Sequence, residues 1–179
     1  MTSTSTPNNE PEDKSSPKSH SESNPEIYDV FRKSWQAATP EEKIRQQLLS
    51  RMVDQLGYPP NLLVIEKALH QLPHLALRKD IPLRRADIIC FAKGIHPSFD
   101  LYPLLMIECK AATLTTAVIR QVVGYNYYVQ ALFVAVANET EERTGWYNTK
   151  ADEYTFVPHL PSFNALMATV GNDSRLNLK

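Results

Sequence analysis

The segment 104–110, LLMIECK, constrains the fold more than any other stretch of the chain. Its uninterrupted apolar start is typical of a strand that is buried on both faces of a sheet. Because side chains alternate between the two faces of a strand, Glu108 and Lys110 share a face with Met106. A carboxylate and an ammonium therefore point the same way at the end of a predicted central strand.

The chain has 179 residues, which is enough for one domain with a substantial core. Residues 1–26 contain scarcely any apolar side chain, so we expect a disordered polar tail. Residues 27–179 are predicted to form a single domain, with a core over 38–138 and a C-terminal elaboration over 139–179. The apolar residues of segment 27–31 are expected to form a short strand or turn that docks on this domain.

The formal net charge is −1, so nucleic-acid binding would need a local basic patch and not a global basic field. Cys90 and Cys109 each lie in an apolar run, which fits reduced thiols better than a disulfide framework. The sequence shows no apolar signal core and no run of membrane-spanning length. We therefore expect a cytoplasmic protein without membrane contact.

The clearest helix covers residues 40–56. Thr39 can act as its N-cap, Pro40 occupies the first helical position, and Glu42 completes a Thr-x-x-Glu capping box. An apolar stripe follows, and Gly57 is expected to end the helix. Arg45 lies near the centre of this stripe, so it should pair with an acid, in a structural or a site-supporting role.

The rest of the chain predicts an α/β fold: a helix, a meander of three strands, a second helix and a fourth strand. The four strands are expected over 61–69, 81–92, 102–110 and 131–137, and the second helix over 113–130. Two short strands and a terminal helix should follow, over 145–149, 153–157 and 161–170.

The second and third strands predict a metal site. Segment 93–103 is rich in turn-forming residues and should be the loop of an antiparallel hairpin. A symmetric register then places Asp87 opposite Glu108 and Ile89 opposite Met106. Two acids that close repel each other unless a divalent cation lies between them, and hard oxygen ligands suit Mg²⁺.

More ordinary explanations exist for the same residues. Glu108 and Lys110 can form a simple ion pair on one face of the strand. Asp87 can pair with Arg84 or Arg85, two or three positions earlier in the chain.

The motifs resemble a known family. RRADIICF…LLMIECKA is similar to the core motif of the PD-(D/E)XK nuclease superfamily. TPEEKIRQQLL followed by LGYP resembles the start of the N-terminal nuclease domain of type I restriction enzyme R subunits. Gln121 and Tyr125 match the Gln-x-x-x-Tyr motif of the RecB-like branch. The resemblance covers residues 38–138, and Ala86 stands where the motif usually has proline.

The resemblance implies a restriction-endonuclease-like core, with a mixed sheet of about four to six strands flanked by helices. It also implies a metal-dependent (deoxyribo)nuclease that hydrolyses phosphodiester bonds of DNA. Asp87 and Glu108 would bind Mg²⁺, for which Mn²⁺ could substitute. The implied catalytic residues are Asp87, Glu108, Lys110, Gln121, Tyr125, Glu41 and Glu42.

Their implied roles differ. Lys110 would position an attacking water or help to deprotonate it. Gln121 and Tyr125, one helical turn apart, would orient Lys110 or a phosphate oxygen. Glu41 or Glu42 would add a carboxylate, either behind the metal ligands or as a ligand of a second metal. For these two residues the helix dipole and the capping box are sufficient alternatives.

The sequence has no Gly-x-x-x-x-Gly-Lys-Ser/Thr motif, so we expect no ATP-driven motor in this chain. DNA is the expected partner, and other nuclease or helicase subunits are further candidates. Two alternatives to an active nuclease are a catalytically silent nucleic-acid-binding or assembly module with the same fold, and a structural or protein-interaction domain.

Overall fold

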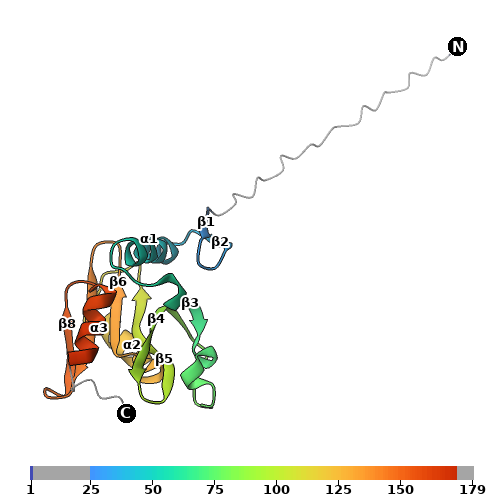
Figure 1. Cartoon of the computed structure of the whole chain (residues 1–179). Coiled ribbons are helices and arrows are strands. Elements are labelled where there is room, and N and C mark those ends of the chain that lie inside the picture. Colours follow the sequence, from blue (N-terminus) through green and yellow to red (C-terminus); the bar gives the residue numbers. More distant parts are fainter. Residues whose placement is uncertain (2–24, 173–179) are drawn as a thin grey trace.

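The computed structural model describes Met1 and residues 25–172. A six-stranded sheet forms its centre, in the order β3-β4-β5-β6-β7-β8 (Figure 1). β5 and β6 run parallel, and every other neighbouring pair is antiparallel. The strands are β3 (Leu63–Ala68), β4 (Arg85–His96), β5 (Phe99–Cys109), β6 (Phe133–Ala137), β7 (Glu142–Asn148) and β8 (Glu153–Val157).

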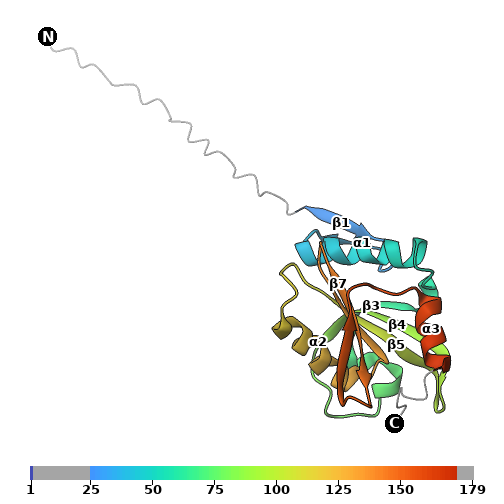
Figure 2. The same cartoon turned by 90° about the vertical axis from the view of Figure 1, so that its left-hand side faces the viewer.

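Three α-helices surround this sheet: α1 (Pro40–Asp54), α2 (Thr116–Val129) and α3 (Phe163–Asn172). α2 and α3 lie on opposite sides of the sheet, and α1 crosses one end of it (Figure 2). Three short 3₁₀ helices flank β3 in the chain: Pro60–Leu62, Leu69–Gln71 and Pro73–Leu75. The predicted α/β fold with a mixed, helix-flanked sheet is thereby confirmed. None of the described helices is long and apolar enough to cross a membrane.

A small hairpin precedes the domain. It consists of β1 (Glu26–Asp29) and β2 (Ser34–Ala37) and lies beside the start of α1 (Figure 1). The expected docking strand or turn over 27–31 thus belongs to this hairpin. The predicted disordered tail falls mostly on residues 2–24, outside the described part of the chain, and β1 begins at its last residue.

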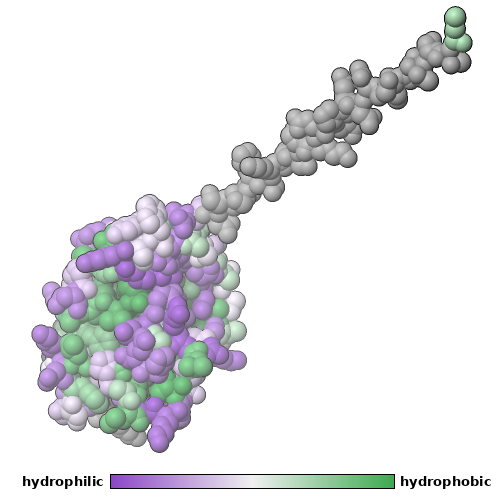
Figure 3. Space-filling model, turned by 90° about the vertical axis from the view of Figure 1, so that its right-hand side faces the viewer, coloured by the Kyte–Doolittle hydropathy of each residue, from purple (hydrophilic) through white to green (hydrophobic). Residues whose placement is uncertain are grey.

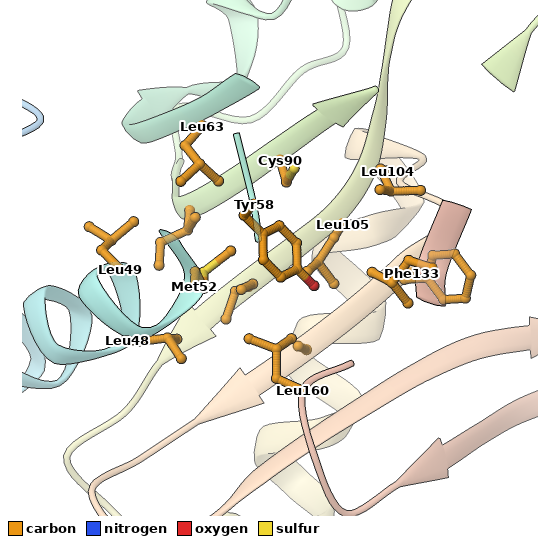
Figure 4. Close-up of a cluster of buried hydrophobic side chains, with 14 of the residues drawn as sticks. Leu48, Leu49, Met52, Tyr58, Leu63, Cys90, Leu104, Leu105, Phe133 and Leu160 are labelled. Carbon is orange, nitrogen blue, oxygen red and sulfur yellow. The ribbon is translucent and has the colours of Figure 1, made fainter. Parts of the chain in front are cut away.

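Two hydrophobic clusters cover the two faces of the sheet. One packs Leu48, Leu49 and Met52 of α1 around the fully buried Tyr58 (Figure 4). The other contains residues of the 3₁₀ helices and of α2 together with Met106. Apolar side chains of β5 enter both clusters, because successive residues of the strand point to opposite faces. The prediction of a strand buried on both sides is confirmed.

The start of α1 confirms one half of the predicted capping box and contradicts the other. Thr39 is the N-cap, and its Oγ1 accepts a hydrogen bond from the Glu42 backbone N–H at 3.1 Å. The Glu42 carboxylate does not return to Thr39, whose own N–H donates to the Ala37 carbonyl at 2.8 Å. Glu42 instead forms ion pairs with other residues. Gly57 has φ +69° and follows the helix end, as predicted.

The β4–β5 hairpin has the predicted register, with Ile89 opposite Met106 and Ile88 opposite Ile107. The predicted long loop over 93–103 is wrong, because β4 and β5 continue to a tight turn at residues 97–98. The turn-forming residues that suggested a loop lie within the two strands, which contain two register shifts. Pro103, for example, pairs with Phe91 beside one of these shifts, where a missing N–H is tolerated.

Two glycines give a matched test of how tightly β7 packs against β8. A Cβ added at Gly145 in β7 would lie 2.5 Å from the ring of Phe156, its partner on β8. We expect Gly145→Ala to lower the free energy of unfolding by about 1–3 kcal/mol, because the ring must move. Gly124→Ala, at an open position of α2, should raise it by up to about 1 kcal/mol. Denaturant melts measure both, and a neutral Gly145→Ala would contradict the packing.

Candidate metal centre

Asp87 lies in β4 at the position facing Glu108 of β5. The ladder ends on this side with the pair Ile88–Ile107, and Asp87 and Glu108 are the next residues on the two strands. Its Oδ2 accepts a hydrogen bond from the Cys109 backbone N–H at 2.7 Å. The two acids therefore project from neighbouring antiparallel strands on one face, as the sequence predicts.

Glu108 is a buried carboxylate with one satisfied oxygen. Its residue is 5 % exposed, and its Oε2 lies 3.2 Å from Lys110 Nζ. Its Oε1 is buried and has no hydrogen-bond partner among the described residues. Burial, and next the charge of Asp87, raise the pKa of Glu108 to about 7. Such an oxygen is costly to bury without a partner, and a cation would satisfy it.

Lys110 directly follows β5 and extends the pairing with β6, since its backbone N–H donates to the Ala137 carbonyl at 2.9 Å. Burial alone would lower the pKa of its ammonium. The carboxylates of Glu108 and Asp87 outweigh that effect and hold the pKa above its ordinary value. Lys110 therefore stays charged at neutral pH.

Arg45 of α1 lies among three carboxylates from three different elements. Its Nη2 contacts Glu42 at 2.5 Å, and its Nη1 contacts Asp87 at 2.9 Å as well as Glu66 of β3. The residue is 5 % exposed, so these charges meet away from bulk water. The expectation that Arg45 pairs with an acid is confirmed, and one of its acids is the predicted metal ligand.

The alternative partners of Asp87 do not form ion pairs with it. Arg85 lies 3.9 Å from Glu66, and Arg84 contacts Tyr125. The pKa of Asp87 is raised, chiefly by burial, although the Cys109 amide and Arg45 lower it in part. The cation that Asp87 contacts comes from a helix forty-two residues earlier, which sequence proximity could not reveal.

Glu66 is the one charged residue of this cluster that the sequence analysis missed. It lies in β3 between Ile65 and Lys67, which pair with Ile88 and Ala86 of β4. Glu66 itself has φ +50°, a left-handed conformation that is rare for a residue with a side chain. A signal was present, because an acid interrupts the apolar run of segment 61–69 as Glu108 interrupts that of β5.

Two residues of α2 form the opposite border of the site. Gln121 Nε2 donates to Tyr125 Oη at 2.7 Å, and the Arg84 guanidinium lies 4.7 Å from the centre of the Tyr125 ring. Tyr125 is also close enough to Lys110 to raise the pKa of that ammonium. No hydrogen bond between described residues joins either side chain to Lys110, so their predicted roles stay predictions.

The two acids at the start of α1 occupy different environments. Glu42 is buried and contacts Arg32, Arg45 and Gln46. Burial would raise the pKa of its carboxyl, but these partners lower it below its ordinary value. Glu41 is exposed, and its Oε1 accepts a hydrogen bond from the Ala111 N–H at 3.4 Å, beside Lys110. Glu42 is thus an ion-pair partner of Arg45, whereas Glu41 contacts the segment that follows β5.

The carboxylate oxygens of Asp87 and Glu108 are of the kind that Mg²⁺ takes as ligands. Within residues 25–172 no group of three or more His, Cys, Asp or Glu side chains is placed to hold a metal. Mg²⁺ commonly keeps several waters and uses only one or two carboxylates, so a third acid is not required. The unpartnered Oε1 of Glu108 is the observation that favours such an ion here.

Comparison with protein families gives one match. Residues 40–161 match the family described as the type I restriction enzyme R protein N terminus. The chain belongs to this family. Comparisons with curated proteins and with solved structures found no match.

The matched region of this type I restriction R protein N-terminal domain runs from the start of α1 to the segment before α3. It contains every residue of the candidate site. The β1–β2 hairpin and α3 lie outside it. The sequence resemblance to type I restriction enzymes is thereby confirmed for the part of the chain that carries the acids.

The pKa of Glu108 gives a test in the absence of metal. The folded protein binds this proton more tightly than the unfolded chain, whose carboxyl titrates near 4.5. Ionising Glu108 therefore costs stability, and the cost grows as the pH rises from about 4.5 to about 7. In EDTA, the free energy of unfolding of the wild type should fall relative to Glu108→Gln by up to about 3 kcal/mol across this window. Denaturant titrations at pH 4.5–8 measure both free energies. A difference between the two proteins that does not change with pH would contradict the raised pKa of Glu108.

Proposed function

We propose that this domain is a Mg²⁺-dependent nuclease that hydrolyses phosphodiester bonds of DNA, with a site of the PD-(D/E)XK kind. One observation supports this most: two acids face each other on adjacent strands, one with a buried, unpartnered oxygen, and a charged lysine lies beside them. A cation would satisfy that oxygen, which the contacts among the described residues do not. Membership in the restriction family points to the same chemistry.

The two acids would hold the metal, and they differ in the protein groups that their oxygens contact. Asp87 is fixed by the Cys109 N–H and by Arg45, so its carboxylate cannot rotate freely. Glu108 would bind through Oε1, while its Oε2 keeps Lys110 in place. A bound Mg²⁺ would polarise the scissile phosphate and acidify a water molecule.

Lys110 would act as a cation and hydrogen-bond donor. Its raised pKa keeps the ammonium protonated at neutral pH, which favours positioning a water or a phosphate oxygen over removing a proton. The charge would also stabilise the extra negative charge of the transition state. Gln121 and Tyr125 would line the same opening from α2 and offer hydrogen bonds to a phosphate oxygen.

DNA would approach along the basic residues that precede Asp87. Lys79 and Arg85 are exposed, and Arg84 packs on the Tyr125 ring at the border of the site. Exposed basic side chains of this segment can bind phosphates although the net charge of the chain is −1. Hydrophilic side chains also spread over the middle of the face on the β3 side, with hydrophobic side chains beside them (Figure 3).

The family also suggests a biological setting. We infer a role in restriction–modification, in which other subunits of that kind, including a helicase, would supply DNA translocation. Cys90 and Cys109 are free and buried, which suits a reducing cytoplasm.

A cleavage assay tests the proposed activity. The wild-type chain should cut plasmid or linear DNA in Mg²⁺ or Mn²⁺ and be inactive in EDTA. Glu108→Gln and Lys110→Met should lower the rate by at least about 100-fold, because each removes a charge that acts in the transition state. Lys150→Ala, in the exposed turn between β7 and β8, is the matched control and should cut normally. Binding of DNA without cleavage would favour the catalytically silent module instead.

A binding titration tests the basic approach. Lys79→Ala and Arg85→Ala should each weaken DNA binding about equally for all sequences, as expected for lost phosphate contacts. Each should also reduce the slope of log affinity against log salt by about 1. Fluorescence anisotropy at several salt concentrations measures both quantities, with Lys150→Ala as the control. Unchanged slopes would place the DNA on another surface.

A further inference from the structure

A permanent positive charge lies on one side of the candidate metal centre. Arg45 Nη1 contacts both Asp87 and Glu66, and Nη2 contacts Glu42. A guanidinium does not lose its proton in proteins, so this charge is present whether or not a metal is bound. Asp87 therefore has one cation, Arg45, in contact with its carboxylate before any metal is bound.

Glu66, which contacts this charge, has an unusual backbone conformation in β3. The neighbouring pairs Ile65–Ile88 and Lys67–Ala86 place Glu66 opposite Asp87 in the register. At Glu66 the strand adopts φ +50°, a strained conformation for a residue that is not glycine. Such strain persists only where surrounding contacts hold it, and Glu66 forms an ion pair with Arg45 and a longer one, at 3.9 Å, with Arg85.

Glu66 and Asp87 without Arg45 would be two adjacent acids, which is how a second divalent ion is usually held. In two-metal sites the ions lie about 3.5–4 Å apart and share carboxylates. Here the place between Glu66 and Asp87 is filled by the guanidinium. Both oxygens of Asp87 already accept hydrogen bonds, Oδ1 from Arg45 and Oδ2 from Cys109.

We propose that Arg45 is a built-in cation at the position of a second metal, so that the domain binds one divalent ion, between Asp87 and Glu108, and not two. Arg45 and Glu66 are then positioning residues that hold Asp87 ready in the metal-free protein. This inference rests on the proposed metal-dependent function, and its test separates the two.

The number of bound ions is the first measurement. The full chain is titrated with Mn²⁺ alone, and the free ion is counted by electron paramagnetic resonance. One Mn²⁺ per chain is the expected result. Two ions would overturn the inference and leave the proposed metal-dependent function intact. No bound ion would overturn both, because the centre between Asp87 and Glu108 would then not exist.

Glu66→Gln decides whether Glu66 is a ligand of the metal or a partner of Arg45. The amide keeps the shape of the side chain and can still accept a hydrogen bond from the guanidinium. We expect Mn²⁺ affinity within about threefold of the wild type and an unchanged count of one. A loss of tenfold or more would overturn the inference, since it would make Glu66 a metal ligand.

Arg45→Met removes the fixed cation and leaves Glu42, Glu66 and Asp87 facing one another. In EDTA this variant should melt at a lower temperature than the wild type. In saturating Mn²⁺ it should gain a second ion and a larger rise in melting temperature. Arg51→Met is the matched control: it removes an ion pair with Glu142 from the same helix and should still bind one ion. A count of one for Arg45→Met would contradict the inference, and the Glu66→Gln result stands even if this variant does not fold.

Discussion

The buried guanidinium of Arg45 is the interaction on which the site depends. It connects α1, β3 and β4 at one end of the sheet, through Glu42, Glu66 and Asp87. A buried charge is tolerated only when its partners are close and well oriented, and loss of one partner leaves the others uncompensated. These contacts therefore link the position of α1 across the strand ends to the orientation of Asp87.

The same set of contacts continues outward to the N-terminal hairpin. Arg32 contacts both Glu42 and Asp29, and Asp29 is fully buried. Asp29 Oδ1 also accepts the Phe31 and Arg32 backbone N–H groups, at 2.7 and 3.0 Å. These bonds hold the pKa of Asp29 below its ordinary value, although burial opposes them. An unbroken series of alternating charges thus runs from the hairpin to the candidate metal ligand, which ties the placement of an element outside the family match to the site.

The two acids of the candidate metal centre are held in opposite ways. Asp87 has both oxygens engaged and a fixed cation beside it, whereas Glu108 has one buried oxygen without a partner. Burial raises the pKa of both, so each would be stabilised by a further positive charge. Asp87 is thus already oriented by protein groups, whereas Glu108 keeps one carboxylate oxygen without a partner among the described residues.

The sequence by itself determined most of the central elements, although not the tight turn between β4 and β5. The cap at Thr39, the double-sided burial of β5 and the register of Ile89 with Met106 follow from local pattern and from a symmetric hairpin. Only the tertiary structure decided that Asp87 contacts Arg45, because these residues lie far apart in the chain. It also decided that the Glu42 carboxylate forms ion pairs with Arg32 and Arg45 and not a bond to the Thr39 backbone. The left-handed backbone conformation of Glu66 could not be predicted either. The periodicity of apolar residues indicates which face of a strand a residue occupies, but it does not indicate the φ angle of one residue or its ion pair with Arg45.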